Sequence, residues 1–362
     1  MSKKIKILLT GGGTGGSVTP LLALAQSLKA SGDDYDFLWI GTTAGPEREM
    51  VIQEEIDFKA IQSGKLRRYF SLKNVTDIAR IFVGLWQSWV IIRKYQPDLI
   101  IGAGSFVCLP PAVVGYFCHI PVIAHQQDVR QGLANRLIKP FAKAVTVSLE
   151  QSLGDYGVKA VWIGNPVRQE FAAVLKNKKL ADSFIEKYNL KNDLPLVLIF
   201  GGGTGASKIN ALVVDSLKEL TKFSQVLHLT GRGKAQDIKN KNYLALDFLD
   251  ALDMAAAMAA ASLIVSRCGM GALTEISFLG KPAILIPMPD SHQEDNAEVF
   301  AAKEAAIILA QKEINADNFV KLIKKLLANQ NKLDELSRNI KQVMPADANS
   351  KLVAEIKKIF GK

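Results

Sequence analysis

The chain has 362 residues, of which 48% are hydrophobic and 22% charged, and it carries a formal net charge of +10. Its length fits two globular domains better than one, and its composition excludes a disordered chain. Three cysteines without a CxxC pair exclude a disulfide framework and favour reduced thiols. No clean run of 18 apolar residues is present, which argues against a membrane span.

Short apolar runs alternate with helical patterns from the N-terminus onward. The first half contains predicted strands at 4–9, 36–40, 99–101, 121–124 and 144–147. The second half contains predicted strands at 196–200, 225–229, 243–245, 263–266 and 283–286. This alternation predicts α/β domains with parallel sheets and right-handed crossovers. Ligands bind such sheets at the carboxyl ends of the strands.

A glycine-rich loop follows the first predicted strand of each half. Residues 11–17 read GGGTGGS, and residues 201–207 read GGGTGAS. Glycines let the backbone turn tightly and bring its N–H groups close to an anion at the N-terminus of the next helix. The repeat predicts two similar domains that bind nucleotides or phosphates. Both loops also satisfy the dinucleotide fingerprint, so an NAD(P)-dependent oxidoreductase is one alternative.

Positive charge concentrates in segment 59–94, which has eight Lys and Arg residues and one acid, Asp77. Bulky apolar residues are interleaved with these charges, among them Phe70, Ile78, Phe82, Trp86 and Trp89. A nucleic-acid-binding protein would also be basic, but this mixture suits an anionic lipid surface better. A core helix with a solvated basic face is the alternative.

A third motif, SRCGMGALTE at 266–275, follows an apolar strand and opens a helix. Gly269 and Gly271 would expose backbone N–H groups at the helix N-terminus, where a diphosphate can bind. Glu275 lies about one turn further on, and its oxygens suit a pair of ribose hydroxyls. Alternatively, its carboxylate complements the helix dipole.

Polar side chains also follow two other predicted strands. His292, Gln293 and Asn296 could bind sugar hydroxyls, or they could be ordinary surface groups. His125 and Asp128 follow strand 121–124, where they are candidates for acid–base chemistry. Asp128 could instead cap a helix start. Four histidines without an HxH pair predict no protein-built metal site.

The order of these motifs resembles the MurG family, glycosyltransferases that add N-acetylglucosamine to the lipid-linked muramyl-pentapeptide precursor of peptidoglycan. The segments GNPVR at 164–168 and HQxxNA at 292–297 carry the resemblance most specifically. It implies a GT-B fold: two facing Rossmann-like domains with parallel sheets, 1–163 and 164–345, and a C-terminal helix, 346–362, that returns to the first domain.

The resemblance also implies a reaction. GlcNAc would pass from UDP-GlcNAc to the C4 hydroxyl of undecaprenyl-pyrophosphoryl-MurNAc-pentapeptide with inversion, without a required cofactor. The enzyme would be peripheral on the cytoplasmic side of an anionic membrane, with partners in cell-wall synthesis and no nucleic acid. The implied donor-binding residues are Arg168, Gly203, Thr204, Gly205, Leu249, Gly269, Met270, Gly271, Ala272, Glu275, His292, Gln293 and Asn296. The implied acceptor-binding residues are Thr14, Gly15, Gly16, Arg67, Gly104, Ser105, Gln127 and Asn135.

The catalytic candidates lie where the chain departs from the family pattern. The family usually has histidine at the position of Ser17, and it has His-Glu-Gln-Asn where residues 125–128 read HQQD. A serine hydroxyl is no base near neutral pH, so Asp128 is the hypothesised base, with His125 as its orienting partner or the alternative base. Two alternatives remain: a catalytically impaired homologue that binds UDP-sugar or lipid, and a transferase for another lipid-linked acceptor.

Overall fold

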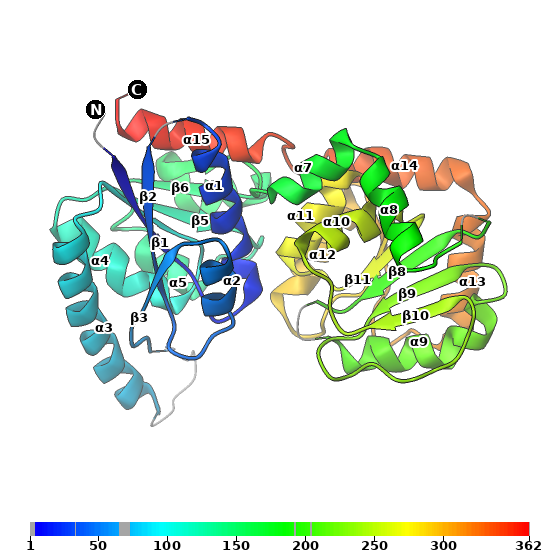
Figure 1. The fold of residues 1–362 in the computed structure, drawn as a ribbon. Coiled ribbons are helices and arrows are strands. Elements are labelled where there is room, and N and C mark those ends of the chain that lie inside the picture. The colour runs from blue at the N-terminus through cyan, green and yellow to red at the C-terminus, as the bar shows by residue number, and fades with distance from the viewer. Residues whose placement is uncertain (1–3, 33, 65–72, 192, 203–204, 362) are drawn as a thin grey trace. The chain divides into compact units, whose positions relative to one another are not determined.

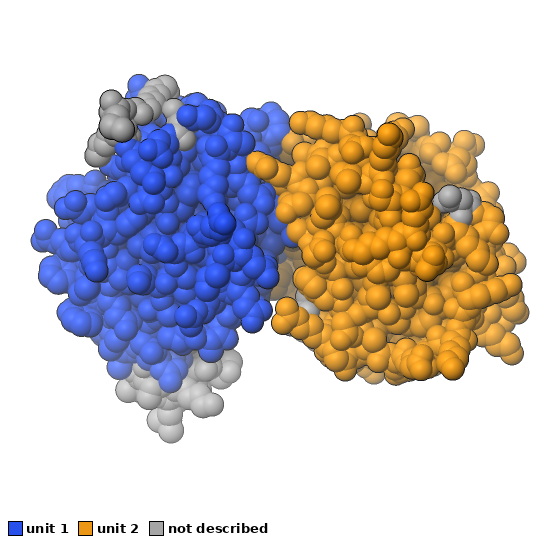
Figure 2. All heavy atoms as spheres, in the orientation of Figure 1, with its two compact units in different colours: residues 1–168, 347–362 blue, residues 169–346 orange. Residues whose placement is uncertain are grey.

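A computed structural model describes residues 4–32, 34–64, 73–191, 193–202 and 205–361, without the side chains of 73–76 and 78. The chain forms two compact units, coloured separately in Figure 2. Unit 1 comprises Met1–Arg168 and Asp347–Lys362, and unit 2 comprises Gln169–Ala346. Within the described residues, no helix combines the length and the apolar character needed to cross a membrane.

Unit 1 is built on a seven-stranded parallel sheet with the order β3-β2-β1-β4-β5-β6-β7. Its strands are β1 Ile5–Thr10, β2 Tyr35–Gly41, β3 Asp57–Ala60, β4 Leu99–Gly102, β5 Val122–Gln126, β6 Ala144–Val147 and β7 Ala160–Trp162. The strand order reverses between β1 and β4. In open α/β sheets, ligands bind outside the carboxyl ends of the strands at such a reversal.

Unit 2 repeats this arrangement with six parallel strands in the order β10-β9-β8-β11-β12-β13. The strands are β8 Leu196–Phe200, β9 Gln225–Leu229, β10 Tyr243–Leu246, β11 Leu263–Ser266, β12 Ala283–Leu285 and β13 Ile307–Ile308. The reversal lies between β8 and β11. The predicted fold class, with two Rossmann-like parallel sheets, is therefore confirmed.

Helices cover both faces of each sheet (Figure 1). Those of unit 1 are α1 Thr19–Lys29, α2 Glu47–Gln53, α3 Lys73–Tyr95, α4 Leu109–Phe117, α5 Leu133–Ile138, α6 Leu153–Tyr156 and α15 Ala348–Ile359. Those of unit 2 are α7 Gln169–Lys176, α8 Lys179–Lys187, α9 Ser207–Leu220, α10 Ala251–Ala260, α11 Met270–Leu279, α12 His292–Ala302, α13 Ala316–Leu327 and α14 Gln330–Lys341. Because both faces are covered, the central strands are continuously apolar rather than alternating.

The two faces of the unit 1 sheet bury different residues of β1. Ile7 and Leu9 pack into one core cluster together with Leu352 and Ile356 of α15, whereas Leu8 belongs to the cluster on the opposite face. This division follows from the two-residue period of a strand. The C-terminal helix α15 lies against α1 in the same unit (Figure 1).

Asn349 of α15 fixes the end of unit 1. Its Oδ1 accepts a hydrogen bond from the Val167 N–H at 2.8 Å, and its Nδ2 donates to the Val167 carbonyl at 2.9 Å and to Ser27 Oγ at 2.7 Å. These bonds hold the segment before Gln169 on unit 1. The chain therefore enters unit 2 after Arg168, slightly later than the boundary expected at 164.

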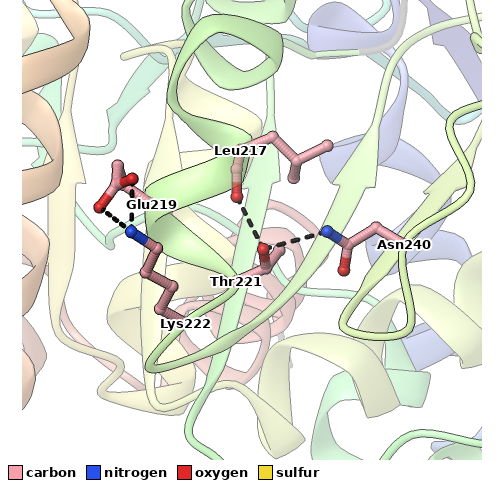
Figure 3. Close-up of polar contacts among 5 residues, drawn as sticks. All are labelled: Leu217, Glu219, Thr221, Lys222 and Asn240. Atoms are coloured by element: carbon pink, nitrogen blue, oxygen red, sulfur yellow. Dashed lines mark hydrogen bonds and ion pairs between the residues drawn. The ribbon is translucent and has the colours of Figure 1, made fainter.

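In unit 2, α9 follows the second glycine loop, and its far end is held by Thr221. The Thr221 hydroxyl donates to the Leu217 carbonyl at 2.8 Å and accepts from Asn240 Nδ2 at 3.1 Å (Figure 3). Lys222 pairs with Glu219 at 2.6 Å on the exposed side of the same turn. An exposed pair of this kind stabilises little. The buried Thr221 contacts tie α9 to the connection between β9 and β10.

Candidate active site

The glycine motifs follow the two strands that flank each reversal of strand order. In unit 1, residues 11–17 follow β1, and residues 103–108 follow β4. In unit 2, the 201–207 loop follows β8, and Arg267–Met270 follows β11. The sequence thus places four loops at the two positions where this type of sheet binds ligands.

Ser17 points into its own loop. Its hydroxyl accepts a hydrogen bond from the Gly12 N–H at 3.1 Å. The same hydroxyl has two carbonyl oxygens within reach as acceptors, that of Gly12 at 3.0 Å and that of Thr14 at 3.1 Å. The side chain is only 6% exposed. Gly13 has φ +84°, a conformation that favours glycine. Ser17 therefore holds the loop closed, and the structure does not support a direct catalytic role for it.

Glu47, which the sequence analysis did not single out, closes the same loop from outside. Its buried carboxylate accepts from the Gly13 N–H at 3.1 Å and from the Thr42 N–H at 2.6 Å. A Cβ on Gly12 would lie 2.3 Å from Glu47 Oε1, so this approach requires glycine.

We expect Glu47→Ala to lower the free energy of unfolding by about 1–3 kcal/mol, because the N–H groups of Gly13 and Thr42 lose a charged acceptor. Urea unfolding of the full-length protein measures this. Glu49→Ala, on the exposed side of the same helix, should change stability by less than about 0.5 kcal/mol. Equal effects of the two substitutions would show that the loop does not depend on Glu47.

His125 is fully buried, with its two ring nitrogens engaged. Nδ1 lies 2.9 Å from Thr146 Oγ1, and Nε2 lies 2.8 Å from Asn165 Oδ1. Burial lowers the pKa of the imidazole to about 4, so the ring is neutral near pH 7. His125 joins β5 to β6 and to the GNP segment. The structure does not support it as the alternative base, because an enclosed ring cannot reach a substrate hydroxyl.

Two residues predicted to bind the acceptor make hydrogen bonds to the main chain near His125. Gln127 donates to the Ala103 carbonyl at 3.2 Å, and Asn135 donates to the His125 carbonyl at 3.2 Å. Both are buried. They tie the turn after β5 to the loop after β4, which contains Gly104 and Ser105. Asp128 lies in this turn and is partly exposed.

In unit 2, Gly269 is the N-cap of α11 and no described side chain caps this helix start. Glu275 follows in the second turn and is partly exposed. Gln293 Oε1 accepts from the Cys268 N–H and from the Met288 N–H, each at 3.2 Å. Its carbonyl oxygen therefore holds the motif loop, and His292 beside it is exposed.

The position of the Asn296 side chain does not fit the predicted direct contact with the sugar. Its side chain is completely buried, and its Nδ2 donates to the Cys268 carbonyl at 3.1 Å. Its supported role is to position the 266–275 motif. Arg267, missed in the sequence analysis, acts similarly: its guanidinium donates to the carbonyls of Ile286 and Pro287 at 3.0 Å each. Partial burial lowers its pKa.

Two further donor residues follow strands of unit 2, Gly205 after β8 and Leu249 after β10. Gly205 has φ +70°, and a Cβ there would lie 2.2 Å from the Thr230 carbonyl oxygen. Leu249 is buried, beside the exposed ring of Phe248. Arg168 is half-buried at the end of unit 1. Arg67, Gly203 and Thr204 lie outside the described residues.

No group of three or more His, Cys, Asp or Glu side chains is placed to hold a metal ion in the part of the chain that the structure describes. The N-terminus of α11, which has no side-chain cap, suits an anion. Backbone N–H groups and the helix dipole both favour negative charge at this position.

The chain resembles known proteins over its whole length. Residues 7–147 match the glycosyltransferase family 28 N-terminal domain, and residues 196–352 match its C-terminal domain. A Clostridium kluyveri protein named UDP-N-acetylglucosamine–N-acetylmuramyl-(pentapeptide) pyrophosphoryl-undecaprenol N-acetylglucosamine transferase is 35% identical, covering 98% of this chain and 99% of its own. A Legionella pneumophila protein of the same name is 34% identical, covering 97% and 96%.

A solved structure supports the fold. The crystal structure of Acinetobacter baumannii MurG matches with a TM-score of 0.74 at 22% identity, covering 98% of this chain and 100% of that one. The oxidoreductase alternative rested on glycine patterns alone, and two glycosyltransferase domains now account for both loops. The chain belongs to the MurG family of UDP-N-acetylglucosamine-dependent transferases, with the GT-B fold expected from its motifs.

Proposed function

We propose that this protein transfers N-acetylglucosamine from UDP-N-acetylglucosamine to the C4 hydroxyl of undecaprenyl-pyrophosphoryl-MurNAc-pentapeptide. The observation that carries the proposal is end-to-end similarity to transferases with this name, at 35% identity over 98% of the chain. The glycine-rich loops at both sheet reversals are consistent with a nucleotide donor and a pyrophosphate-bearing acceptor.

Unit 2 would bind the donor. The N–H groups at the start of α11 receive the diphosphate, whose charge increases as UDP leaves. The carboxylate of Glu275, one turn further along, accepts hydrogen bonds from the ribose hydroxyls. Hydrogen bonds from Cys268 to the side chain of Gln293, and from the buried side chain of Asn296 to Cys268, hold the motif in place for this role.

Unit 1 would supply the base. The Asp128 carboxylate takes the proton of the C4 hydroxyl, the hydroxyl oxygen attacks the anomeric carbon, and the bond to UDP breaks on the opposite face, so the configuration inverts. Asp128 is the partly exposed carboxylate in the turn after β5. The His125 ring and the Ser17 hydroxyl are both hydrogen-bonded within the protein.

Acceptor-dependent release of UDP by the purified protein tests this function. UDP should appear only when both UDP-N-acetylglucosamine and the lipid-linked acceptor are present. A protein that binds UDP-N-acetylglucosamine but releases no UDP with this acceptor would be a catalytically impaired homologue or a transferase for another lipid. A panel of other polyprenyl-linked sugars would separate these two outcomes.

The outer side of α3 is the surface we propose to rest on anionic lipid. Phe82, Trp86 and Trp89 are 67%, 64% and 46% exposed, and their spacing places them on one side of the helix. Helix α3 packs against α4, and Ile92, away from the exposed aromatic residues, is buried. Arg93 lies 5.5 Å from the Trp89 ring, so a cation accompanies the aromatic residues.

Two more aromatic residues of unit 1 are exposed. Tyr116 and Phe117, at the end of α4, are also exposed. Aromatic side chains that insert at the interface, together with basic side chains near lipid headgroups, are typical of peripheral membrane binding. We place the protein on the cytoplasmic side of the membrane by its resemblance to the family. Phe70 and the side chain of Ile78 lie outside what the structure describes.

Replacing Phe82 and Trp86 together by serine should weaken binding to vesicles containing anionic lipid at least tenfold, which is about 1.4 kcal/mol, because apolar area no longer leaves water. Vesicle co-sedimentation measures this. Val158→Ser, which changes a fully exposed apolar residue elsewhere in unit 1, is the matched control. Unchanged binding of the double variant would rule out this side of α3 as the lipid contact.

A further inference from the structure

Gln126, the last residue of β5, has a buried side chain whose hydrogen-bonding capacity is filled. Its Nε2 donates to the carbonyl of Asp128 at 2.7 Å and to that of Arg130 at 3.1 Å. Its Oε1 accepts from Asn135 Nδ2 at 2.7 Å and from Tyr156 Oη at 2.9 Å. An amide has two donors and accepts through two lone pairs, so these bonds use all of it. The side chain therefore joins the turn after β5 to α5 and α6.

These partners require an amide at position 126. The carbonyls of Asp128 and Arg130 can only accept hydrogen bonds, so their partner must donate twice. A glutamate of the same length would direct carboxylate oxygens at two carbonyl oxygens in a buried place, where an unpaired charge is costly. The shorter of the two donated bonds, at 2.7 Å, goes to the main-chain carbonyl of Asp128 itself.

We propose that Gln126 is a positioning residue, whose amide sets the turn that carries the Asp128 carboxylate. This inference rests on the proposed role of Asp128 as the base. Gln126 touches the main chain of residues 128 and 130, so it acts on the direction of the carboxylate and not on the substrate. A displacement of about 1 Å in a reacting group can cost about 100-fold in rate.

The first test is Gln126→Glu in the full-length protein, with UDP release as the assay. At pH 8 the variant should lose about 10–100-fold in kcat, with KM for UDP-N-acetylglucosamine unchanged. Burial and the facing carbonyls raise the pKa of the introduced carboxyl group. When it is protonated it donates one hydrogen bond again. The ratio of variant to wild-type kcat should therefore rise as the pH falls from about 8.5 to 6.

Few other titratable groups surround position 126. Tyr156 of α6 contacts it directly, and burial raises the pKa of that phenol to about 12, so it stays neutral over this range. His125 precedes it, and its pKa of about 4 keeps it neutral as well. The other charged residues on the turn and on α5 and α6 are Asp128, Arg130, Arg136 and Asp155. All four remain in the wild-type reference, so the ratio of kcat values isolates the new carboxyl group.

Two further variants separate positioning from loss of stability. Gln126→Met has no donor and no charge, so it should lose kcat similarly but without recovery at low pH. Tyr156→Phe removes one bond to Oε1 and leaves both donated bonds, so its kcat should stay within about threefold of wild type. Thermal unfolding gives the folded fraction of each variant. Losses of kcat that only follow the folded fraction, or a Gln126→Glu variant that stays fully active at pH 8, would overturn the inference.

Different results would overturn the positioning role of Gln126 and the proposed transferase function. If Asp128→Asn is inactive while Gln126→Glu keeps its kcat, only the positioning role falls. If Asp128→Asn keeps full turnover, the base assignment falls and takes the positioning role with it. A wild-type protein without acceptor-dependent UDP release would overturn the proposed function itself.

Discussion

Asp128→Asn should lower kcat by about 10²–10⁴-fold, because asparagine has the same shape but cannot take a proton from the acceptor hydroxyl. Asp128 is the catalytic candidate that retains a partly exposed acidic group: the His125 ring is enclosed, and the Ser17 hydroxyl is bonded within its loop. KM for UDP-N-acetylglucosamine should not change, because the proposed donor residues lie mainly in unit 2.

Steady-state UDP release with saturating acceptor measures this effect. Asp155→Asn, an exposed acid on α6 of the same unit, is the matched control and should keep normal turnover. Full turnover of a folded Asp128→Asn protein would contradict the assignment. Asp128 would then serve only the local turn, and the base would have to be sought among other residues of unit 1.

Glu275→Ala should raise KM for UDP-N-acetylglucosamine about 10–100-fold with a smaller change in kcat. The carboxylate would lose charge-assisted hydrogen bonds to the ribose, each worth about 1.5–3 kcal/mol, and 1.4 kcal/mol corresponds to tenfold. These bonds are present before and during the reaction, so their loss appears mainly in donor binding.

Titration calorimetry with UDP checks this expectation without turnover. Glu298→Ala, on the exposed side of α12, is the control and should bind UDP normally. Unchanged UDP affinity in Glu275→Ala would mean that the carboxylate only complements the dipole of α11, the alternative reading of its place near the helix start.

The central strands could be predicted from the sequence because they are buried on both faces. β6, β8, β9 and β11 begin and end where their apolar runs do. β3, β7 and β13 were not predicted, and all three are edge strands. β3 reads DFKA and is largely exposed, so it has no apolar run to detect, and β13 has only two residues.

The positions of the motif loops were predictable, but the directions of their side chains were not. Strand order decides which loops meet, and short motifs identify those loops. The partners that turn a side chain inward lie far away in the sequence. Glu47 is 34 residues from Gly13, and Asn165 is 40 residues from His125. No local pattern marks such pairs, so the sequence predicted acid–base chemistry for His125 and a sugar contact for Asn296, although both side chains support the loops.

Mass spectrometry of the lipid product tests the central claim most directly. Purified wild-type protein is incubated with UDP-N-acetylglucosamine and the undecaprenyl-linked muramyl-pentapeptide, and the acceptor and UDP are quantified together. We expect the acceptor to gain one N-acetylhexosamine for each UDP released. We expect Asp128→Asn to form less product than the wild type by a factor of about 100 or more. Tight binding of UDP-N-acetylglucosamine without glycosylated lipid, or UDP release that does not depend on the acceptor, would contradict it.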